Sequence, residues 1–245
     1  MLPTPIDTAV IMAAGLGTRF GSATELMPKG FIAVGGKPMV VRSIEALLRC
    51  GIRHILIGTG YRSEQYEALH NTYPQIECCY SERYAETNSM YTLYNMRTLV
   101  GDRDFLLLES DLVYEDRAIT ALLSDSHPTT MLITPVTKFQ DQYYVERDAN
   151  NRLVACSTDS QTLHPSGELV GIHKLSASFY RLMCNDYAAR VANEPKLGYE
   201  FQILSMSKQQ QVYVLREEGL KWYEIDDVQD KAYAEHHIIP YIDKQ

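Results

Sequence analysis

Residues 8–20 have the sequence TAVIMAAGLGTRF, and this stretch decides the fold class. Its first half is a short apolar run, which is typical of a buried parallel strand. Gly15 and Gly17 then mark a loop, and Pro28-Lys29 follows a short distance downstream. Glycines let the chain approach a ligand closely, and successive backbone N–H groups in such a loop can surround anionic oxygens. The stretch therefore predicts a strand that ends in an anion-binding loop.

Two cations accompany this loop. Arg19 can donate to two oxygens of a triphosphate at once, whereas the ammonium of Lys29 acts as a compact charge. The pattern is neither GxxxxGK[ST] nor GxGxxG, because Phe20 occupies the position of the third glycine. The alternative interpretation is an ordinary strand-to-helix turn with Arg19 and Lys29 in solvent. The complete string of strand, AAGxGTR and PK is more specific than its parts, and it favours the nucleotide-binding interpretation.

Apolar runs and helical periodicities alternate between residues 8 and 136. After the first strand, further strands are predicted at 53–58, 76–80, 104–114 and 129–136. Helices are predicted between them, at 39–50, 63–73, 88–100 and 118–125, with Ser63 as a candidate N-cap. Such alternation is typical of an α/β fold with a doubly wound, mostly parallel sheet, which we describe as Rossmann-like. Ligands of such sheets bind beyond the carboxyl ends of the strands.

The sequence changes character after about residue 137. Residues 143–159 predict a hairpin with a turn at Asn150-Asn151, and residues 138–175 are interpreted as a small β-rich lid or acceptor-binding region. The remaining predicted elements are a strand at 167–176, a helix at 176–193, strand-like sequence at 211–227 and a C-terminal helix at 228–242. We find no interdomain linker or internal repeat, so residues 1–245 predict a single domain.

Composition sets the broad class of the protein. The chain has 245 residues, 45% of them hydrophobic, and a formal net charge of −8. This charge argues against a general affinity for nucleic acids or anionic membranes. No apolar run approaches the roughly 20 residues of a membrane span, and the N-terminus lacks the basic segment of a signal peptide. Five cysteines without a CxxC spacing fit a reducing, cytoplasmic location.

Two predicted strands end in acidic residues. Glu109-Ser110-Asp111 follows an apolar run, and a second acidic run begins at Glu224 and includes Asp226. Mg²⁺ prefers one or two carboxylates together with phosphate oxygens and water, and it stabilises charge during displacement at phosphorus. The alternative is that these are solvated acids at strand ends. No constellation of nucleophile, histidine and acid is evident, which fits an acceptor whose oxygen is already anionic.

The glycine-rich string with its downstream Pro-Lys resembles the nucleoside-triphosphate signature of the sugar-nucleotidyltransferase-like superfamily, which has the pyrophosphorylase fold. The resemblance implies that Lys29 and Arg19 act in catalysis and that Asp111 and Asp226 hold Mg²⁺. It also implies nucleotide contacts from residues at the ends of the first strands and at a helix start, namely Ala13, Ala14, Gly15, Gly17, Thr18, Arg19, Gly60, Asn88 and Ser89. The expected reaction moves a nucleoside monophosphate from a triphosphate and releases pyrophosphate.

The resemblance covers nearly the whole chain. It includes the strings MPKGF, LLLESDLVY, GELVGIHKL, PKLGYE and YEIDDVQ, which are most similar to the compact cytidylyltransferases that activate 2-aminoethylphosphonate or phosphocholine. It implies CTP and 2-aminoethylphosphonate as substrates, in phosphonate biosynthesis, with phosphocholine as the alternative acceptor. The resemblance also allows a separate transaminase as a partner in the same pathway.

Residue chemistry leaves the acceptor open. A choline head favours an aromatic cage, whereas a primary ammonium needs carboxylate or carbonyl acceptors. The cage candidates are Tyr143, Tyr144, Tyr199 and Trp222, and the ammonium candidates are Glu146, Glu168 and Glu200. With Lys174 as a candidate for the phosphonate, the predicted acceptor-binding residues are Glu168, Lys174, Tyr199 and Glu200. Other hypotheses are a sugar-1-phosphate or molybdenum-cofactor-type nucleotidyltransferase, and a regulatory protein that binds nucleotide without turnover.

Overall fold

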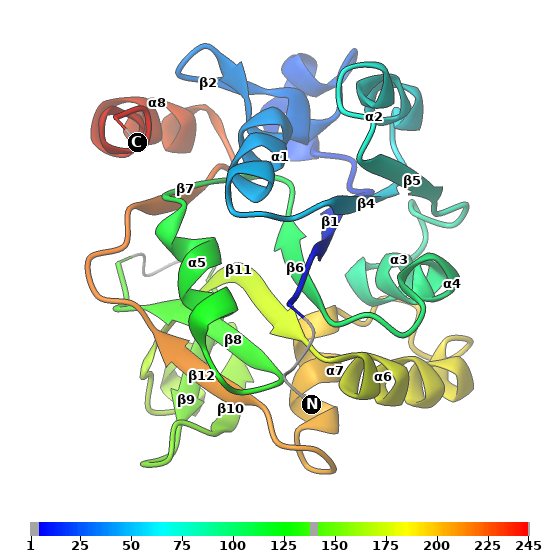
Figure 1. Cartoon of the computed structure of the whole chain (residues 1–245), viewed down its shortest axis with the longest axis vertical. Helices are drawn as coiled ribbons and strands as arrows, with labels where there is room; N and C mark the ends of the chain where they lie inside the picture. The colour runs from blue at the N-terminus through cyan, green and yellow to red at the C-terminus, as the bar shows by residue number, and fades with distance from the viewer. Residues whose placement is uncertain (1–4, 138–141, 245) are drawn as a thin grey trace.

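A computed structural model describes residues 5–137 and 142–244 of the chain. A nine-stranded sheet runs through it in the order β10-β9-β11-β6-β1-β4-β5, and β8 pairs with β11 and carries β12 (Figure 1). The first strands of this sheet along the chain are β1 (Thr8–Ala13), β4 (His54–Thr59), β5 (Ile76–Tyr80) and β6 (Phe105–Glu109). Neighbours among these four are parallel, so the predicted parallel α/β core is confirmed.

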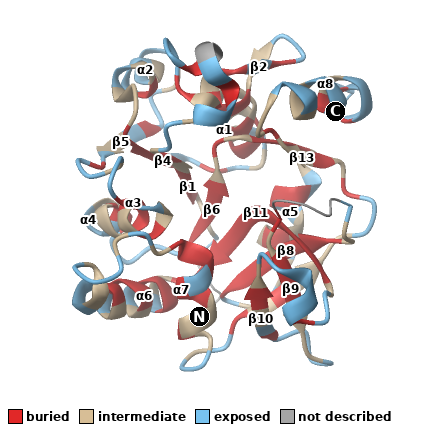
Figure 2. Cartoon of the chain, turned by 180° about the vertical axis from the view of Figure 1, so that it is seen from behind, coloured by how far each residue is buried: buried red, intermediate tan, exposed pale blue. Residues whose placement is uncertain are grey.

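Helices cover both faces of this sheet, because successive side chains of a strand point to opposite faces. Ala9 and Ile11 of β1 pack on the face covered by α1 (Met39–Arg49), α2 (Ser63–Ala68) and α5 (Arg117–Ser124). Val10 packs on the other face, which is covered by α3 (Ser89–Asn95), α4 (Arg97–Val100), α6 (Ala177–Arg190) and α7 (Tyr199–Met206). Figure 2 shows the central strands β6 and β11 buried between these layers. The sheet is therefore doubly wound.

The C-terminal half of the sheet is built around β11 (Gly167–Leu175), which is buried along its whole length. It is antiparallel to β6, to β8 (Thr130–Thr134) and to β9 (Tyr144–Arg147), and β8 pairs in parallel with β12 (Tyr213–Arg216). β9 and β10 (Leu153–Ser157) form the predicted hairpin, and Asn151 in its turn has a φ of 59°. Residues 138–141 of the predicted lid lie outside the described residues.

The predicted strand at 104–114 is two strands in the structure. After β6 the chain turns, and β7 (Leu112–Tyr114) leaves the main sheet to pair antiparallel with β13 (Trp222–Glu224). The backbone amide of Ile225 also donates to the carbonyl oxygen of Asp111 at 3.0 Å. This pairing brings together the two acidic runs that lie far apart in the sequence.

Helix ends follow local capping rules with small differences from the prediction. Asn88 caps α3, because its side-chain oxygen accepts from the next backbone amide at 2.8 Å. The predicted helix there breaks at Met96 into α3 and α4. Ser63 is the first residue of α2 rather than its cap, since Arg62 occupies the cap position with a φ of 54°.

Helix α7 is missing from the predicted elements, because its buried positions include Glu200 and Gln202 as well as apolar residues. A buried polar residue interrupts the hydrophobic stripe by which a helix is recognised. The remaining elements are β2 (Ala33–Val34), β3 (Lys37–Pro38), α8 (Val228–His237), α9 (Ile239–Ile242) and 3₁₀ helices at Thr18–Thr24, Lys29–Phe31, Leu69–Asn71 and Ser160–Thr162. Across residues 5–137 and 142–244, no helix combines the length and apolar character needed to cross a membrane.

Candidate active site

A cavity of about 330 Å³ opens at the carboxyl ends of β1 and β6. Parallel α/β sheets bind their ligands at this position. The cavity is lined by the glycine-rich loop, the segment after β6 and the starts of α3 and α7. The predicted site residues that line it are Ala13, Ala14, Gly15, Gly17, Lys29, Asn88, Ser89, Asp111, Tyr199 and Glu200.

Gly17 shapes the glycine-rich loop for two reasons. Its φ of 63° lies in the left-handed region, which only glycine adopts without strain. A Cβ at this position would also lie 2.9 Å from the Cβ of Lys29. The loop therefore lies directly against Lys29, which is one of its predicted partners. Thr18 and Arg19 are exposed at the rim and are not part of the described lining.

The ammonium of Lys29 lies between two carboxylates. Its Nζ donates to Asp111 Oδ2 at 2.6 Å and to Asp226 Oδ1 at 2.7 Å. Burial alone would lower the pKa of Lys29, but the two carboxylates outweigh it and raise this pKa above its ordinary value. The side chain is therefore charged at neutral pH. Arg19 Nη1 lies 3.0 Å from Asp226 Oδ2, so the structure joins the four predicted catalytic and metal-binding residues in one ionic cluster.

The acids of this cluster suit a divalent cation. Asp111 and Asp226 already converge on one cationic group, the ammonium of Lys29. Asp111 Oδ1 is buried and has no hydrogen-bond partner in the described part of the chain. A buried acceptor without a donor favours a cation beside it, and carboxylate oxygens are the ligands that Mg²⁺ prefers. The residues present therefore fit the ion that the sequence analysis expects.

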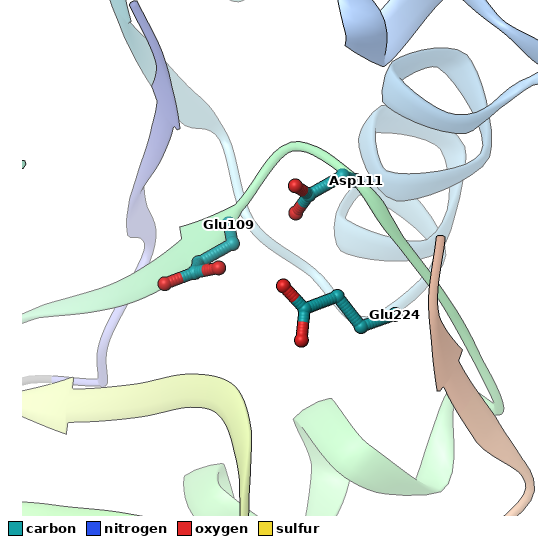
Figure 3. Close-up of side chains that lie close together, drawn as sticks. All are labelled: Glu109, Asp111 and Glu224. Atoms are coloured by element: carbon teal, nitrogen blue, oxygen red, sulfur yellow. The ribbon is translucent and has the colours of Figure 1, made fainter. Parts of the chain in front are cut away.

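Two further glutamates lie beside Asp111. Carboxylate oxygens of Glu109, Asp111 and Glu224 lie within 4.8 Å of one another, and Figure 3 shows the three side chains around a common space. Burial, and then repulsion from neighbouring acids, raises the pKa of Glu109 well above its ordinary range. Neither Glu109 nor Glu224 is among the predicted site residues, although each precedes a predicted metal ligand by two positions. Alternate residues of a strand share a face, so this spacing was the available signal.

A second buried acidic side chain, Glu200, lies near Glu109 at the start of α7. The hydroxyl of Tyr199 donates to Glu109 Oε1 at 2.7 Å, and the carboxyl groups of Glu109 and Glu200 interact. Glu200 is 4% exposed, its Oε2 has no hydrogen-bond partner among the described residues, and burial raises its pKa to about 7. Tyr143 lines the same cavity and lies in the field of both acids. This acidic pocket, formed by Glu109, Glu200, Tyr143 and Tyr199, can compensate a positive charge on a ligand.

Two predicted acceptor-binding residues lie outside the cavity lining. Glu168 is buried in β11 and accepts from both the backbone amide and the hydroxyl of Thr137. Lys174 is buried where β11 pairs with the start of β6, and its Nζ donates to the carbonyl oxygens of Leu122, at 2.9 Å, and of Asp125. Both charges have partners inside the fold, as buried charges need. Their placement therefore does not support the predicted contact with an acceptor.

The structure also sorts the cage candidates. Tyr143 and Tyr199 line the cavity, whereas Tyr144 and Trp222 do not. Tyr144 is buried within β9, and the indole N–H of Trp222 donates to a threonine hydroxyl inside the fold at 3.0 Å. Among the acidic candidates, only Glu200 belongs to the described lining.

The start of α3 forms another wall of the cavity. Asn88 Nδ2 donates at 3.2 Å to the loop before α7, and Ser89 Oγ accepts from the backbone amide of Tyr199 at 3.1 Å. Gly60 is buried behind the glycine-rich loop, where a Cβ would lie 2.7 Å from the carbonyl oxygen of Ala14. Asn88 and Ser89 therefore line the cavity, while Gly60 supports the loop from behind.

The family described as MobA-like NTP transferase domain matches residues 9–165 of the chain. The matched segment includes the glycine-rich loop, Lys29 and Asp111, and it ends before α7 and Asp226. It covers more than half of the chain and includes the parallel strands that carry the cavity.

Individual relatives share parts of the sequence. The chain is 36% identical over 111 residues to a 2-aminoethylphosphonate cytidylyltransferase of Lancefieldella rimae, covering 45% of each protein. It is 41% identical over 86 residues to a choline-phosphate cytidylyltransferase of Streptococcus pneumoniae, covering 35% of this chain and 37% of the relative. These matches span less than half of the relatives' length.

A solved structure is similar over almost the whole chain. The structure of CTP:phosphocholine cytidylyltransferase from Streptococcus pneumoniae has a TM-score of 0.79 and 25% sequence identity. The match covers 94% of this chain and 99% of the other. The likeness therefore extends well beyond the segment that the family matches.

Proposed function

Because the chain belongs to the family of MobA-like NTP transferase domains, we propose that it transfers CMP from CTP to 2-aminoethylphosphonate and releases pyrophosphate. The observation that carries this proposal is the ionic cluster of Lys29, Asp111 and Asp226, because Lys29 and Asp111 of this cluster line the same cavity as the buried acidic pocket. The cluster suits a nucleoside triphosphate with its metal ion, and the pocket suits a cationic acceptor. Both curated relatives are named as cytidylyltransferases, which supports CTP as the donor.

The proposed reaction is a displacement at the α-phosphorus of CTP. A phosphonate oxygen of the acceptor forms the new P–O bond, and the bond from the α-phosphorus to the oxygen of the β-phosphate breaks. The acceptor oxygen is largely ionised near neutral pH, so no protein base is needed. Lys29, with Arg19 at the rim, supplies positive charge where charge develops on the phosphate oxygens. Positioning and charge neutralisation then account for the rate.

In this proposal Asp111 and Asp226 hold Mg²⁺, and the backbone amides of the glycine-rich loop face the phosphates. When bound, the ion neutralises negative charge on the phosphate oxygens. The ammonium of Lys29 now occupies the place between the two carboxylates. We expect it to contact phosphate oxygens once nucleotide is bound, since a lysine ammonium on a flexible stem can exchange one anionic partner for another.

The acidic pocket favours a primary ammonium on the acceptor. Such a group has three N–H donors and needs oxygen acceptors, and the buried Oε2 of Glu200 is an acceptor without a donor in the described part of the chain. A trimethylammonium group has no N–H and is bound best by several aromatic faces. Tyr143 and Tyr199 lie beside the acids, but the hydroxyl of Tyr199 is already bonded to Glu109. A pocket with two tyrosine rings and the carboxyl groups of Glu109 and Glu200 therefore suits a primary ammonium better than a quaternary one.

Phosphocholine is the second candidate acceptor. The likeness to the choline-phosphate enzyme favours it, and Tyr143 and Tyr199 offer some aromatic surface in the same cavity. The chemistry at phosphorus is the same for both acceptors, because each presents an ionised oxygen. The two proposals differ in the head group that the acidic pocket receives.

Release of pyrophosphate tests both proposals. Purified protein is assayed with Mg²⁺, each of the four nucleoside triphosphates, and 2-aminoethylphosphonate, phosphoethanolamine, phosphocholine or a sugar 1-phosphate. We expect the highest kcat/KM for CTP with 2-aminoethylphosphonate, and phosphoethanolamine is the matched control because it carries the same ammonium on a phosphate ester. A higher kcat/KM with phosphocholine would identify phosphocholine as the acceptor and would leave the proposed active site unchanged. Nucleotide binding without turnover of any acceptor contradicts the enzymatic function and favours a regulatory protein.

A further inference from the structure

A chain of contacts runs from the core of β11 to the acidic pocket. The Nε2 atom of His173 lies 3.4 Å from the hydroxyl oxygen of Tyr199, and that hydroxyl donates to Glu109 Oε1 at 2.7 Å. The rings of His173 and Tyr199 meet edge to face, with centroids 5.6 Å apart and an angle of 70° between planes. Tyr199 and Glu109 line the cavity, whereas His173 does not. His173 can therefore act on a ligand only through Tyr199.

The position of His173 is unfavourable for a polar side chain. His173 has no exposed surface and lies opposite Leu107 of β6 and Met131 of β8. Burial lowers its pKa to about 3, so the ring is neutral. Its Nδ1 has no hydrogen-bond partner in the described part of the chain, and an unpaired buried polar atom destabilises a fold. An apolar residue would suit this place better, so packing does not explain the histidine.

The direction of the hydrogen bonds identifies what His173 supplies. Tyr199 has one hydroxyl proton, and it donates that proton to Glu109. The contact with His173 then requires a proton on Nε2, which leaves Nδ1 as the unpaired acceptor. A donor on the Tyr199 oxygen polarises the hydroxyl and strengthens its hydrogen bond to the carboxyl group of Glu109. It also opposes rotation of the phenolic proton away from Glu109.

Gly171 provides the space for this arrangement. Its φ of 77° lies in the left-handed region, where the pairing of β11 with β8 shifts in register. A Cβ at this position would lie 3.4 Å from Glu109 Cγ. Gly171 therefore leaves room for the Glu109 side chain beside β11, and the same strand reaches the carboxyl group of Glu109 through His173 and Tyr199.

We propose that His173 is a positioning residue for the acceptor, which through Tyr199 orients the carboxyl group of Glu109 toward the ammonium group. The inference rests on the proposed function, in that an amine-bearing acceptor occupies the acidic pocket. His173 makes no contact with the nucleotide in this arrangement. Its removal is therefore expected to affect one of the two substrates and not the other.

Substitution His173→Phe keeps a ring and removes the donor. We expect the KM for 2-aminoethylphosphonate to rise by about two- to tenfold, as for the loss of one hydrogen bond, with an unchanged KM for CTP. The melting temperature should be equal or higher, because the unpaired Nδ1 is removed. His173→Gln restores a donor near Nε2 and should return the KM most of the way. Combining His173→Phe with Tyr199→Phe should add nothing to Tyr199→Phe alone, since both act through one hydrogen bond.

A folded His173→Phe protein with an unchanged acceptor KM overturns the inference, as do equal increases in the KM of both substrates. If His173→Phe does not fold, His173→Asn, which is smaller and places no donor at Nε2, takes its place with the same expected split. The wild type is assayed first with 2-aminoethylphosphonate and phosphocholine. If the wild type turns over phosphocholine but not 2-aminoethylphosphonate, phosphocholine is the acceptor, and the KM comparison is then made with phosphocholine. No turnover of either acceptor contradicts the proposed function and this inference together.

Discussion

The ammonium of Lys29 lies 2.6 Å from Asp111 Oδ2, although 82 positions of the chain separate the two residues. The lysine follows the glycine-rich loop, and the aspartate follows β6. Their contact puts the cation proposed for phosphate binding in direct contact with a carboxylate proposed for metal binding. In the proposed complex Lys29 binds the nucleotide and Asp111 binds the metal ion, so each residue can be tested through a different ligand.

Replacing Lys29 with Met should lower kcat/KM for pyrophosphate release by roughly 100- to 1,000-fold, which is the usual effect of losing one donor to developing charge. Lys29→Arg keeps the charge but not the compact ammonium, so we expect partial activity. Arg49→Met is the matched control, because its guanidinium pairs with Asp116 outside the cavity. Near-normal turnover by Lys29→Met would remove this residue from the catalytic group.

Substitution Asp226→Asn should raise the Mg²⁺ concentration needed for half-maximal activity by about tenfold or more, since a carboxylate ligand is replaced by a weaker neutral one. The measurement is a Mg²⁺ titration of pyrophosphate release at saturating CTP and acceptor. Asp116→Asn serves as the control and should leave the titration unchanged. An unaltered Mg²⁺ requirement with a higher acceptor KM would instead assign Asp226 to the acceptor.

Removing the ionisable carboxyl group of Glu200 should selectively weaken binding of the acceptor. Loss of one partner from a buried charge pair costs about 2–5 kcal/mol, so Glu200→Gln should raise the KM for 2-aminoethylphosphonate by about 30-fold or more. The KM for CTP should stay near the wild-type value. Glu146→Gln is the control, because Glu146 accepts from the backbone amide of His164 outside the lining. A parallel rise in both KM values would speak against a specific ammonium contact.

Lys174 should prove to be a stability residue. Lys174→Met leaves the carbonyl oxygens of Leu122 and Asp125 without their buried donor, and we expect a loss of about 1–3 kcal/mol of unfolding free energy. Thermal or urea denaturation measures this loss, and the KM values should match the wild type. An increased acceptor KM in a stable Lys174→Met protein would support the predicted contact between Lys174 and the acceptor.

Local patterns were sufficient for the part of the site near the N-terminus. The apolar run of β1, the glycines after it and the helix start near Asn88 depend on contacts between neighbours in the chain, so they are visible in the sequence. The structure accordingly places Gly15, Gly17 and Lys29 in one cavity. Glu109 could have been found as well, from its position two residues before Asp111.

The acceptor residues could not be separated in this way. Glu168, Lys174 and Glu200 are all charged and all buried, and a buried charge in a sequence looks the same whether it faces a ligand or a carbonyl oxygen. The partner decides its role, and the partners of Lys174 lie about 50 positions earlier in the chain, in and after α5. Helix α7 escaped prediction for the same reason, since Glu200 and Gln202 occupy buried positions that a periodicity rule expects to be apolar.

The sequence alone determined the alternation of strands and helices, the glycine-rich loop after the first strand and the cationic residues beside it, because each follows from spacing over a few residues. Tertiary structure alone decided that Asp226 joins Asp111, through the pairing of β13 with β7, and that Glu109, Glu200 and Tyr199 form one acidic pocket. Pairings between distant segments depend on how the whole sheet closes and which loops it brings together. That information is distributed over the chain and is held by no single motif.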